Sequence, residues 1–210
     1  MPIDLGPFLD PSTTGVVALE VQENLLDPEH SMIPAIARNA AEIGLVDRLA
    51  RLYSEARRVG APVLYVLDDR RADGLGRSTN LMISRVVKDG SEFFVHGNVV
   101  EQLTPHASDI VIRREHGMTG FFTTPLDLYL RNLGITTVIL TGVSANIAVN
   151  GTAIEAMNLG YRVIVPSDAI AGDPPEYVDM LLKYTIRNVA VVTPVDKIVA
   201  QWASLADAGG

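Results

Sequence analysis

The sequence predicts an α/β protein, a three-layer doubly wound sandwich built on a six-stranded, mainly parallel sheet. Short runs of almost entirely apolar residues alternate with segments of helical periodicity along the whole chain. Such strands are typical of parallel sheets that helices cover on both faces. A length of 210 residues is ordinary for one α/β domain, and no linker, repeat or low-complexity tract divides it. Residues 1–210 are therefore predicted to form a single domain.

The predicted strands are the short apolar runs, which cover residues 15–21, 62–67, 109–114, 136–140, 161–165 and 189–192. The predicted helices carry apolar residues three or four apart, and cover residues 33–59, 123–133, 144–159, 175–188 and 194–205. Gly60, Gly134 and Gly160 mark three of the helix ends. In doubly wound sheets, ligands bind at the carboxyl ends of the strands. The residues that follow each strand are therefore the first candidates for a site.

Composition excludes several classes of function. The formal net charge of −8 disfavours nucleic acid and anionic membranes as partners, since both require a basic face. The chain has no cysteine, which excludes disulfides, thiolate metal sites and a thiol nucleophile. Residues 1–11 lack the features of a signal peptide, and the apolar runs are too short to span a bilayer. We expect a cytoplasmic protein with a small-molecule substrate or ligand.

Glu20 is a carboxylate at the end of an otherwise apolar strand. Burying a carboxylate is costly unless it is paired, so its position needs an explanation. It could be a general acid or base with a raised pKa, or it could hold the strand end by accepting hydrogen bonds from loop amides. Gln22 and Asn24 follow it at strand spacing, and could either bind polar groups of a substrate or tie the loop together.

A charged cluster, Arg113 to His116, ends the third predicted strand. Alternation along a strand places Arg113 and Glu115 on one face and Arg114 and His116 on the other. The cluster indicates either a functional site or a solvated strand end whose ion pairs contribute little. The segment 142–148 is a strand-to-helix turn, whose free amides could hold an anion or an oxyanion. The simpler alternative is a capped helix start with Ser144 as N-cap.

No cofactor or metal is expected. Neither GxGxxG nor GxxxxGK[ST] occurs, which disfavours a flavodoxin-like cofactor carrier. The four histidines show no metal-binding spacing, and are His30, His96, His106 and His116.

Three segments together resemble the isochorismatase-like superfamily, which includes nicotinamidases and other cysteine amidohydrolases. VALEVQEN at residues 17–24 resembles the family's first strand, apolar-apolar-Asp-x-Gln. HGMTGFFTTPL at 116–126 is similar to its K-x-x-x-S-A-F-x-x-T-x-L segment, and TGVSANIAVNGTA at 141–153 to its G-V-x-T-N-x-C-V-x-x-T-A turn. The resemblance covers nearly the whole chain and implies the fold predicted above.

The catalytic positions of the resemblance hold different residues. The family amidohydrolases use an Asp, a Lys and a Cys. Matched by motif, these positions hold Glu20, Glu115 and Ala148 here. A methyl group cannot attack a carbonyl, so the thioester mechanism is excluded. True isochorismatases also lack the cysteine and are understood to hydrolyse a vinyl ether by acid catalysis from the strand-1 Asp, so a member without cysteine can still be an enzyme.

The resemblance leads to two structural hypotheses. If Glu20 and Glu115 both face the pocket, their like charges should raise one pKa, so that the pair shares a proton near neutrality. Alternatively, a one-residue bulge brings Arg114 inward, where it substitutes for the lysine and forms a salt bridge with Glu20. The resemblance also implies a cis peptide bond at Val143–Ser144 and an anion-binding nest of backbone amides near Ala148.

Two functions follow. The first is a hydrolase or lyase without a thiol that uses Glu20 as acid or base. Its substrate would contact Gln22, His116, Phe121, Ser144 and Asn146, and an arginine among Arg70, Arg71 and Arg77 would bind an anionic group. The second is a catalytically silent homologue whose pocket is filled by side chains such as Met118, Phe121 and Phe122. For either function, the resemblance implies a homodimer or homotetramer.

Overall fold

The computed structural model describes residues 4–71, 73–76, 78, 80, 82 and 97–208. At its centre lies a six-stranded sheet in the order β3-β2-β1-β4-β5-β6, in which every neighbouring pair is parallel. The strands are β1 (Thr14–Leu19), β2 (Val63–Asp68), β3 (Ile110–Arg114), β4 (Thr137–Gly142), β5 (Arg162–Pro166) and β6 (Val191–Thr193). The predicted α/β class is confirmed, and the sheet is parallel throughout.

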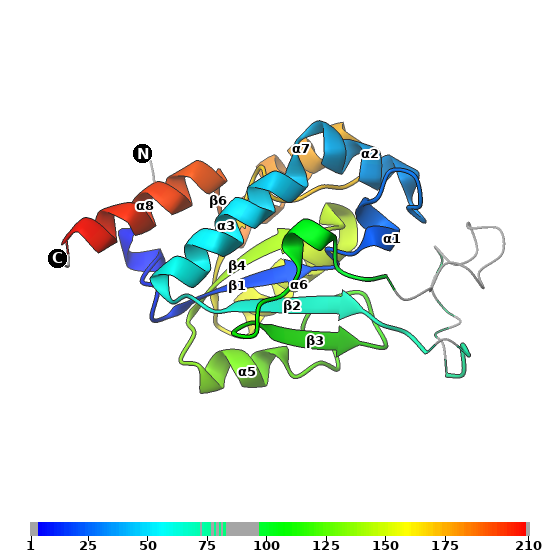
Figure 1. The fold of residues 1–210 in the computed structure, drawn as a ribbon, viewed down its shortest axis with the longest axis horizontal. Helices are drawn as coiled ribbons and strands as arrows, with labels where there is room; N and C mark the ends of the chain where they lie inside the picture. The colour runs from blue at the N-terminus through cyan, green and yellow to red at the C-terminus, as the bar shows by residue number, and fades with distance from the viewer. Residues whose placement is uncertain are drawn as a thin grey trace.

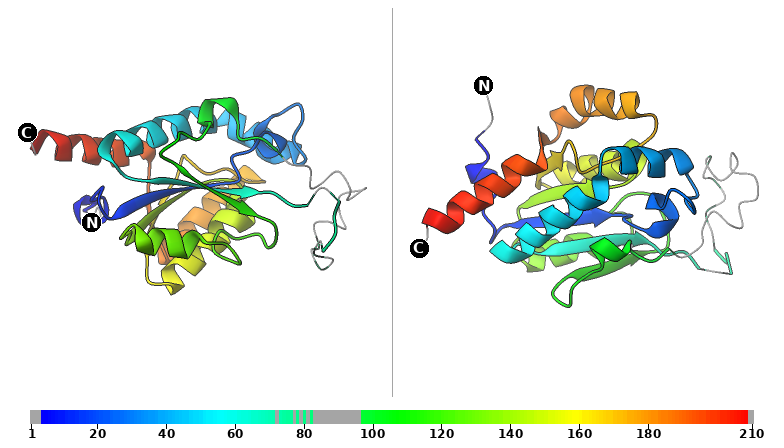
Figure 2. Two further views of the ribbon diagram at one scale, coloured as in Figure 1. Left: turned by 60° about the horizontal axis from the view of Figure 1, so that its bottom comes forward. Right: turned by 45° about the horizontal axis from the view of Figure 1, so that its top comes forward.

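Helices cover both faces of this sheet (Figures 1 and 2). One face carries α2 (Pro34–Glu42), α3 (Leu45–Val59) and α8 (Val195–Ala208), and the other carries α5 (Leu126–Asn132), α6 (Asn150–Asn158) and α7 (Pro175–Tyr184). Each layer buries a separate apolar cluster, because successive strand residues point to opposite faces. Tyr53 and Trp202 belong to the first cluster, and Leu126 and Leu130 to the second. The result is the predicted three-layer sandwich.

Several predicted helices are divided in the structure. Residues 33–59 form two helices, because Gly44 adopts a left-handed conformation (φ 61°) between α2 and α3. The predicted helix 144–159 begins with one wide turn, η3 (Ala145–Val149), before α6. A short helix that was not predicted, α1 (Glu23–Leu26), follows β1, and a single turn at Ile186–Asn188 follows α7. The other short turns are Gly6–Phe8 and Glu101–Leu103. Hydrophobic spacing alone does not locate such breaks.

The strand order reverses direction at β1. The chain proceeds from β1 to β2 and β3 on one side, and then crosses to β4 on the other side of β1. In doubly wound sheets the loops at such a point diverge and leave a crevice at the carboxyl ends. Figure 1 shows these ends on one side of the molecule, next to α1, and the two chain ends on the opposite side. Glu20 and Gly142 therefore lie on the two sides of the expected crevice.

Among the described helices, none has the length and apolar character of a membrane-spanning segment.

Candidate functional site

A cavity of about 270 Å³ opens at the carboxyl ends of β1, β2, β3 and β4. Its polar lining comes from residues that end or follow these strands and from the loop after β5: Glu20, Asp68, Arg114, Ser144, Asn146 and Asp173. Its apolar lining comes mainly from the segment between β1 and α2, and consists of Leu25, Met32, Ile33, Ile36, Met118, Val143 and Ile147. An apolar pocket with a few convergent polar groups is the usual form of a small-molecule site.

Glu20 lies directly after β1, at the wall of this cavity. Its backbone adopts φ 51°, a left-handed conformation that residues other than glycine seldom take. Two hydrogen bonds hold it there: its N–H donates to the carbonyl of Val66 (3.0 Å), and its carbonyl accepts from the N–H of Gln22 (2.9 Å). Such conformations cluster at functional sites, where the surrounding structure enforces them.

Arg114 is the cationic partner of Glu20. Its Nη2 donates a hydrogen bond to Oε1 of Glu20 and lies 3.8 Å from Oδ1 of Asp68. The Arg114 side chain is 2% exposed and the Glu20 side chain 13%, so the ion pair is largely shielded from water. The structure therefore supports the part of the alternative hypothesis in which Arg114 points inward and forms a salt bridge with Glu20.

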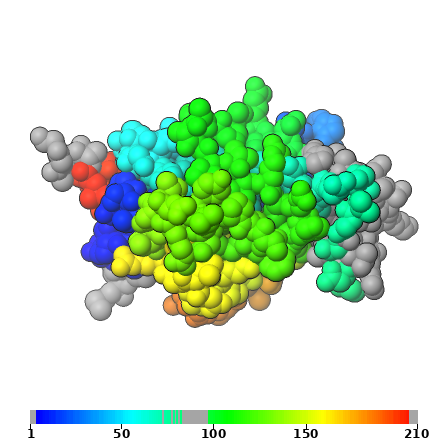
Figure 3. All heavy atoms as spheres, turned by 90° about the horizontal axis from the view of Figure 1, so that it is seen from below, coloured from blue at the N-terminus to red at the C-terminus, as the bar shows by residue number. Residues whose placement is uncertain are grey.

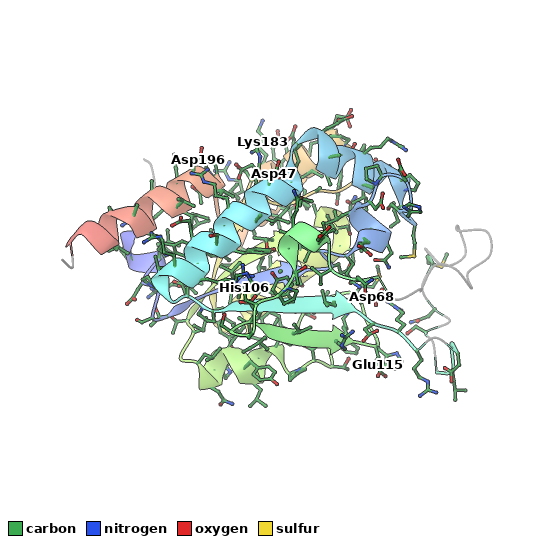
Figure 4. The ribbon with its side chains drawn as sticks, in the orientation of Figure 1. Asp47, Asp68, His106, Glu115, Lys183 and Asp196 are labelled. Atoms are coloured by element: carbon green, nitrogen blue, oxygen red, sulfur yellow. The ribbon has the colours of Figure 1, made fainter. Side chains whose placement is uncertain are left out.

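The predicted pair of Glu20 and Glu115 is wrong, because Glu115 is exposed and does not line the cavity. Regular alternation along β3 explains why: Ile112 and Arg114 are buried, whereas Arg113 is exposed. No bulge is needed to turn Arg114 inward. Figure 4 shows Glu115 beyond the end of β3.

Burial raises the pKa of the Glu20 carboxyl above its ordinary value, because desolvation disfavours the charged form. Arg114 opposes this by attracting the carboxylate, Asp68 adds to it by repulsion, and Arg70 lowers it slightly. The net direction is upward. A carboxyl with a raised pKa can hold a proton closer to neutrality, as a general acid must.

Asp68 is a site residue that the sequence analysis missed. It ends β2, between the ends of β1 and β3, and lines the cavity (Figure 4). Arg70 donates to it from Nε (2.9 Å) and donates from Nη2 to the carbonyl of Gly117 (3.0 Å). The sequence could have indicated Asp68, because it is a polar residue at the carboxyl end of a predicted strand, and ligands of doubly wound sheets bind at these ends.

Gln22 does not line the cavity, so its predicted substrate contact is wrong. The side chain is almost fully buried, and its Nε2 donates to the carbonyls of Asp68 (3.0 Å) and Gly97 (2.8 Å). Its Oε1 accepts from the N–H of Asp68 (2.8 Å). The alternative, that Gln22 ties the loops together, is confirmed: it positions Asp68.

Three other predicted substrate contacts also lie outside the cavity lining. Arg71 is exposed and pairs with Asp73, and His116 is exposed just after β3. Phe121 packs into the core, where its ring stacks on Tyr161 with centroids 5.8 Å apart. Charge and aromaticity indicated a site in these segments, but Arg71 and His116 face solvent and Phe121 faces the core. Arg77 and His96 lie outside the described residues.

Ser144 and Asn146 do line the cavity, as predicted. Ser144 occupies the N-cap position of the turn that follows it, as the alternative expected, but its side chain makes no capping hydrogen bond. The Asn146 side chain makes two hydrogen bonds to the backbone of Asp173: its Oδ1 accepts from the N–H (3.0 Å), and its Nδ2 donates to the carbonyl (2.6 Å). The Val143–Ser144 peptide bond is cis, as the resemblance implies.

Ala148 occupies the same turn as the cavity residues Ser144, Asn146 and Ile147. Its own side chain is buried and lies behind the lining. Its carbonyl accepts a hydrogen bond from Oγ1 of Thr152 (2.6 Å). Residue 148 therefore lies at the same end of the sheet as Glu20, in the turn that forms part of the cavity wall.

In the described part of the chain, no three His, Asp, Glu or Cys side chains are arranged to hold a metal ion.

Comparison with known proteins identifies the family. The family model described as the isochorismatase domain matches residues 14–197, nearly the whole chain. The chain belongs to the isochorismatase family. Ureidoacrylate amidohydrolase RutB of Methylobacterium radiotolerans is 30% identical over 184 residues, covering 80% of this chain and 70% of that protein. The uncharacterized isochorismatase family protein YecD of Escherichia coli is 27% identical over 200 residues, covering 91% of this chain and 97% of that one.

Solved structures of isochorismatase-family proteins share the fold. A cysteine hydrolase from Pseudomonas syringae superposes with a TM-score of 0.82 at 21% identity, covering 94% of this chain and 95% of that one. The N-carbamoylsarcosine amidase of Thermoplasma acidophilum is 28% identical with a TM-score of 0.66, covering 88% of this chain and 97% of that one. The resemblance found in the sequence is confirmed, and with it a hydrolase-like function of the isochorismatase family.

Proposed function

We propose that this isochorismatase-family protein hydrolyses a small molecule by acid–base chemistry at Glu20, without a covalent thiol intermediate. The observation that carries the proposal is the position of Glu20. Its carboxyl is largely buried, has a raised pKa and lies at the wall of a cavity large enough for a small molecule. Perturbed carboxyls in clefts are candidates for proton transfer.

The chain contains no cysteine, so a thiol cannot be the nucleophile. In the proposed reaction, protonated Glu20 donates its proton to the leaving oxygen or nitrogen of the substrate as the bond to carbon breaks. Water adds its hydroxyl to that carbon and loses a proton. That proton returns to the Glu20 carboxylate, so the enzyme ends in its starting state and one water is consumed.

Arg114 contributes by position and charge. It contacts Glu20 and lies near Asp68, so it can hold both side chains in place while the proton of Glu20 is transferred. Its positive charge also limits the rise of the Glu20 pKa. Without such a partner, the pKa of a buried carboxyl would be so high that the group could not readily donate its proton near neutrality.

A catalytically silent homologue is the second candidate. The observation that favours it is that Arg114 already satisfies Glu20 within the protein. Against it stands the open cavity. Of the three side chains predicted to fill a silent pocket, only Met118 lines the cavity, whereas Phe121 packs into the core and Phe122 is 56% exposed. The open cavity favours the hydrolase.

The test is a hydrolysis screen of the wild-type protein with isochorismate, nicotinamide, simple amides and the ureido compounds that the names of its relatives suggest. For any substrate found, Glu20→Gln should lower kcat/KM by about 10²-fold or more. Glu23→Gln, an exposed glutamate three residues away, is the matched control and should leave turnover unchanged. Equal turnover by Glu20→Gln and the wild type would overturn the proposal.

We further propose a cytoplasmic homodimer or homotetramer, as the resemblance implies. Exposed apolar side chains on α5, α6 and α7, which include Leu128, Met157 and Met180, supply a surface for self-association. Figure 3 shows the outer face of this layer around α5 and α6. Light scattering of the purified protein tests this, and a monomeric mass at micromolar concentration would contradict it.

A further inference from the structure

Acidic side chains outnumber basic ones around the cavity. Among the described lining residues, Glu20, Asp68 and Asp173 are acidic, and Arg114 is the only base. This excess of acidic side chains affects which molecules the cavity of the proposed hydrolase can bind.

Two of the three guanidinium nitrogens of Arg114 are already engaged within the protein. Its Nη2 is bound to Glu20, and its Nη1 donates to the carbonyl of Thr119 (3.4 Å). An anion that drew Arg114 away would leave Glu20 without its partner and would itself lie beside the acidic side chains of Glu20 and Asp68. Arg70 lies behind Asp68 and is not part of the lining. An anion entering this part of the cavity would therefore meet repulsion.

Asp173 lies at the cavity with its backbone fixed. The Asn146 side chain makes two hydrogen bonds to its main chain, and Nδ2 of Asn39 donates to the carbonyl of the preceding Gly172 (2.9 Å). Asp173 is exposed, and its carboxylate makes no ion pair or hydrogen bond with the residues that the structure describes. It is thus a charge held in place at the cavity with no internal partner.

The remaining wall requires an apolar ligand body. Seven lining residues are apolar, and four of them come from the segment between β1 and the first turns of α2: Leu25, Met32, Ile33 and Ile36. Contact with such side chains stabilises hydrocarbon groups by removing them from water. The cavity therefore combines an apolar wall with more acidic than basic side chains.

From these features we propose that the cavity selects a positively charged small molecule with an apolar body, such as an amine, and that Asp173 pairs with its cationic group. This inference rests on the proposed function only in placing ligand binding in the same cavity. Asp173 is a specificity-determining residue, and Glu20 and Asp68 act at the other polar part of the ligand. The net charge of −8 also favours the approach of cations over anions.

The test uses three probes with the same aromatic body: phenethylamine, phenethyl alcohol and phenylacetate. None carries a bond to hydrolyse, so calorimetric titration of the full-length protein measures binding whether or not the protein is an enzyme. Phenethylamine should bind about threefold or more tighter than the alcohol, and about tenfold tighter than phenylacetate. Added salt should weaken binding of the amine and leave the alcohol unchanged.

The matched variants are Asp173→Asn and Glu176→Gln, which remove one negative charge each. Glu176 is exposed in the first turn of α7 and is not part of the lining. Asp173→Asn should remove the preference for the amine while the alcohol still binds, and Glu176→Gln should keep the preference. The inference is overturned if the amine binds no tighter than the alcohol, if no probe binds, or if both variants act alike. None of these outcomes bears on turnover by Glu20, which the hydrolysis screen tests separately.

Discussion

Arg114 donates a hydrogen bond to the carboxylate of Glu20, although 94 positions separate the two residues in the sequence. Arg114 ends β3 and Glu20 directly follows β1, and these two strands lie on either side of β2. Asp68, at the end of β2, lies between them and is 3.8 Å from Arg114. Three adjacent strands of a parallel sheet thus bring one cation and two anions to one edge of the cavity.

Loss of Arg114 should destabilise the protein strongly. Arg114→Met leaves Glu20 and Asp68 without their shared cation, and removal of one partner of a buried ion pair typically costs about 3–5 kcal/mol. Arg113→Met is the control: the neighbouring Arg113 side chain is 66% exposed and pairs with Asp69, so its loss should cost less than about 1 kcal/mol. Urea unfolding measures both, and equal costs would contradict the buried pair.

The stability of the protein should depend on pH through Glu20. Because the folded pKa is raised, the folded state keeps this proton above the ordinary value of 4.5, where the unfolded chain releases it. The contribution of Glu20 to the free energy of unfolding is therefore complete below 4.5 and is lost as pH rises through the raised folded pKa.

Urea unfolding of the wild type and Glu20→Gln at a series of pH values measures this contribution. The stability of the wild type relative to the variant should decline as pH rises above 4.5. A relative stability that increases with pH would show instead that Arg114 dominates and lowers the Glu20 pKa.

Thr152 should hold the turn that follows β3. Its Oγ1 accepts from the N–H of Gly120 (2.8 Å) and donates to the carbonyl of Ala148 (2.6 Å). Thr152→Val keeps the shape but leaves a buried N–H without a partner, at a cost of about 1–3 kcal/mol. Thr152→Ser retains the hydroxyl. Hydrogen exchange of the Gly120 amide should accelerate in Thr152→Val and stay slow in Thr152→Ser, and similar exchange in both would contradict this role.

Gly142 should tolerate no side chain. It combines φ +99° with a close approach to β1, where an added Cβ would lie 2.1 Å from the carbonyl oxygen of Leu19. Gly160 has a similar φ of +92° but open space around it. Gly160→Ala should therefore cost only the backbone term of about 1–2 kcal/mol, and Gly142→Ala at least about 2 kcal/mol more. Thermal unfolding compares them, and equal shifts in Tm would refute the close approach.

The order of elements and the sheet class could be predicted from the sequence, because strands buried on both faces are apolar along their whole length. Glu20 could be found for the same reason, since a carboxylate at the end of an apolar strand is conspicuous. The break at Gly44 could not, because the apolar spacing continues across it and a glycine inside a helical pattern does not by itself indicate a left-handed residue.

The residue that faces Glu20 was decided by tertiary structure. For the charged run after the third predicted strand, motif matching selected Glu115 and allowed Arg114 only through a bulge, and a shift of one residue along a strand exchanges the two faces. Pairing of β3 with β2 places Arg114 opposite Asp68, which settles the register. Gln22, Arg71 and Phe121 were misassigned for a related reason: the sequence shows which residues follow a strand, and only packing decides whether each side chain faces the cavity, another loop or solvent.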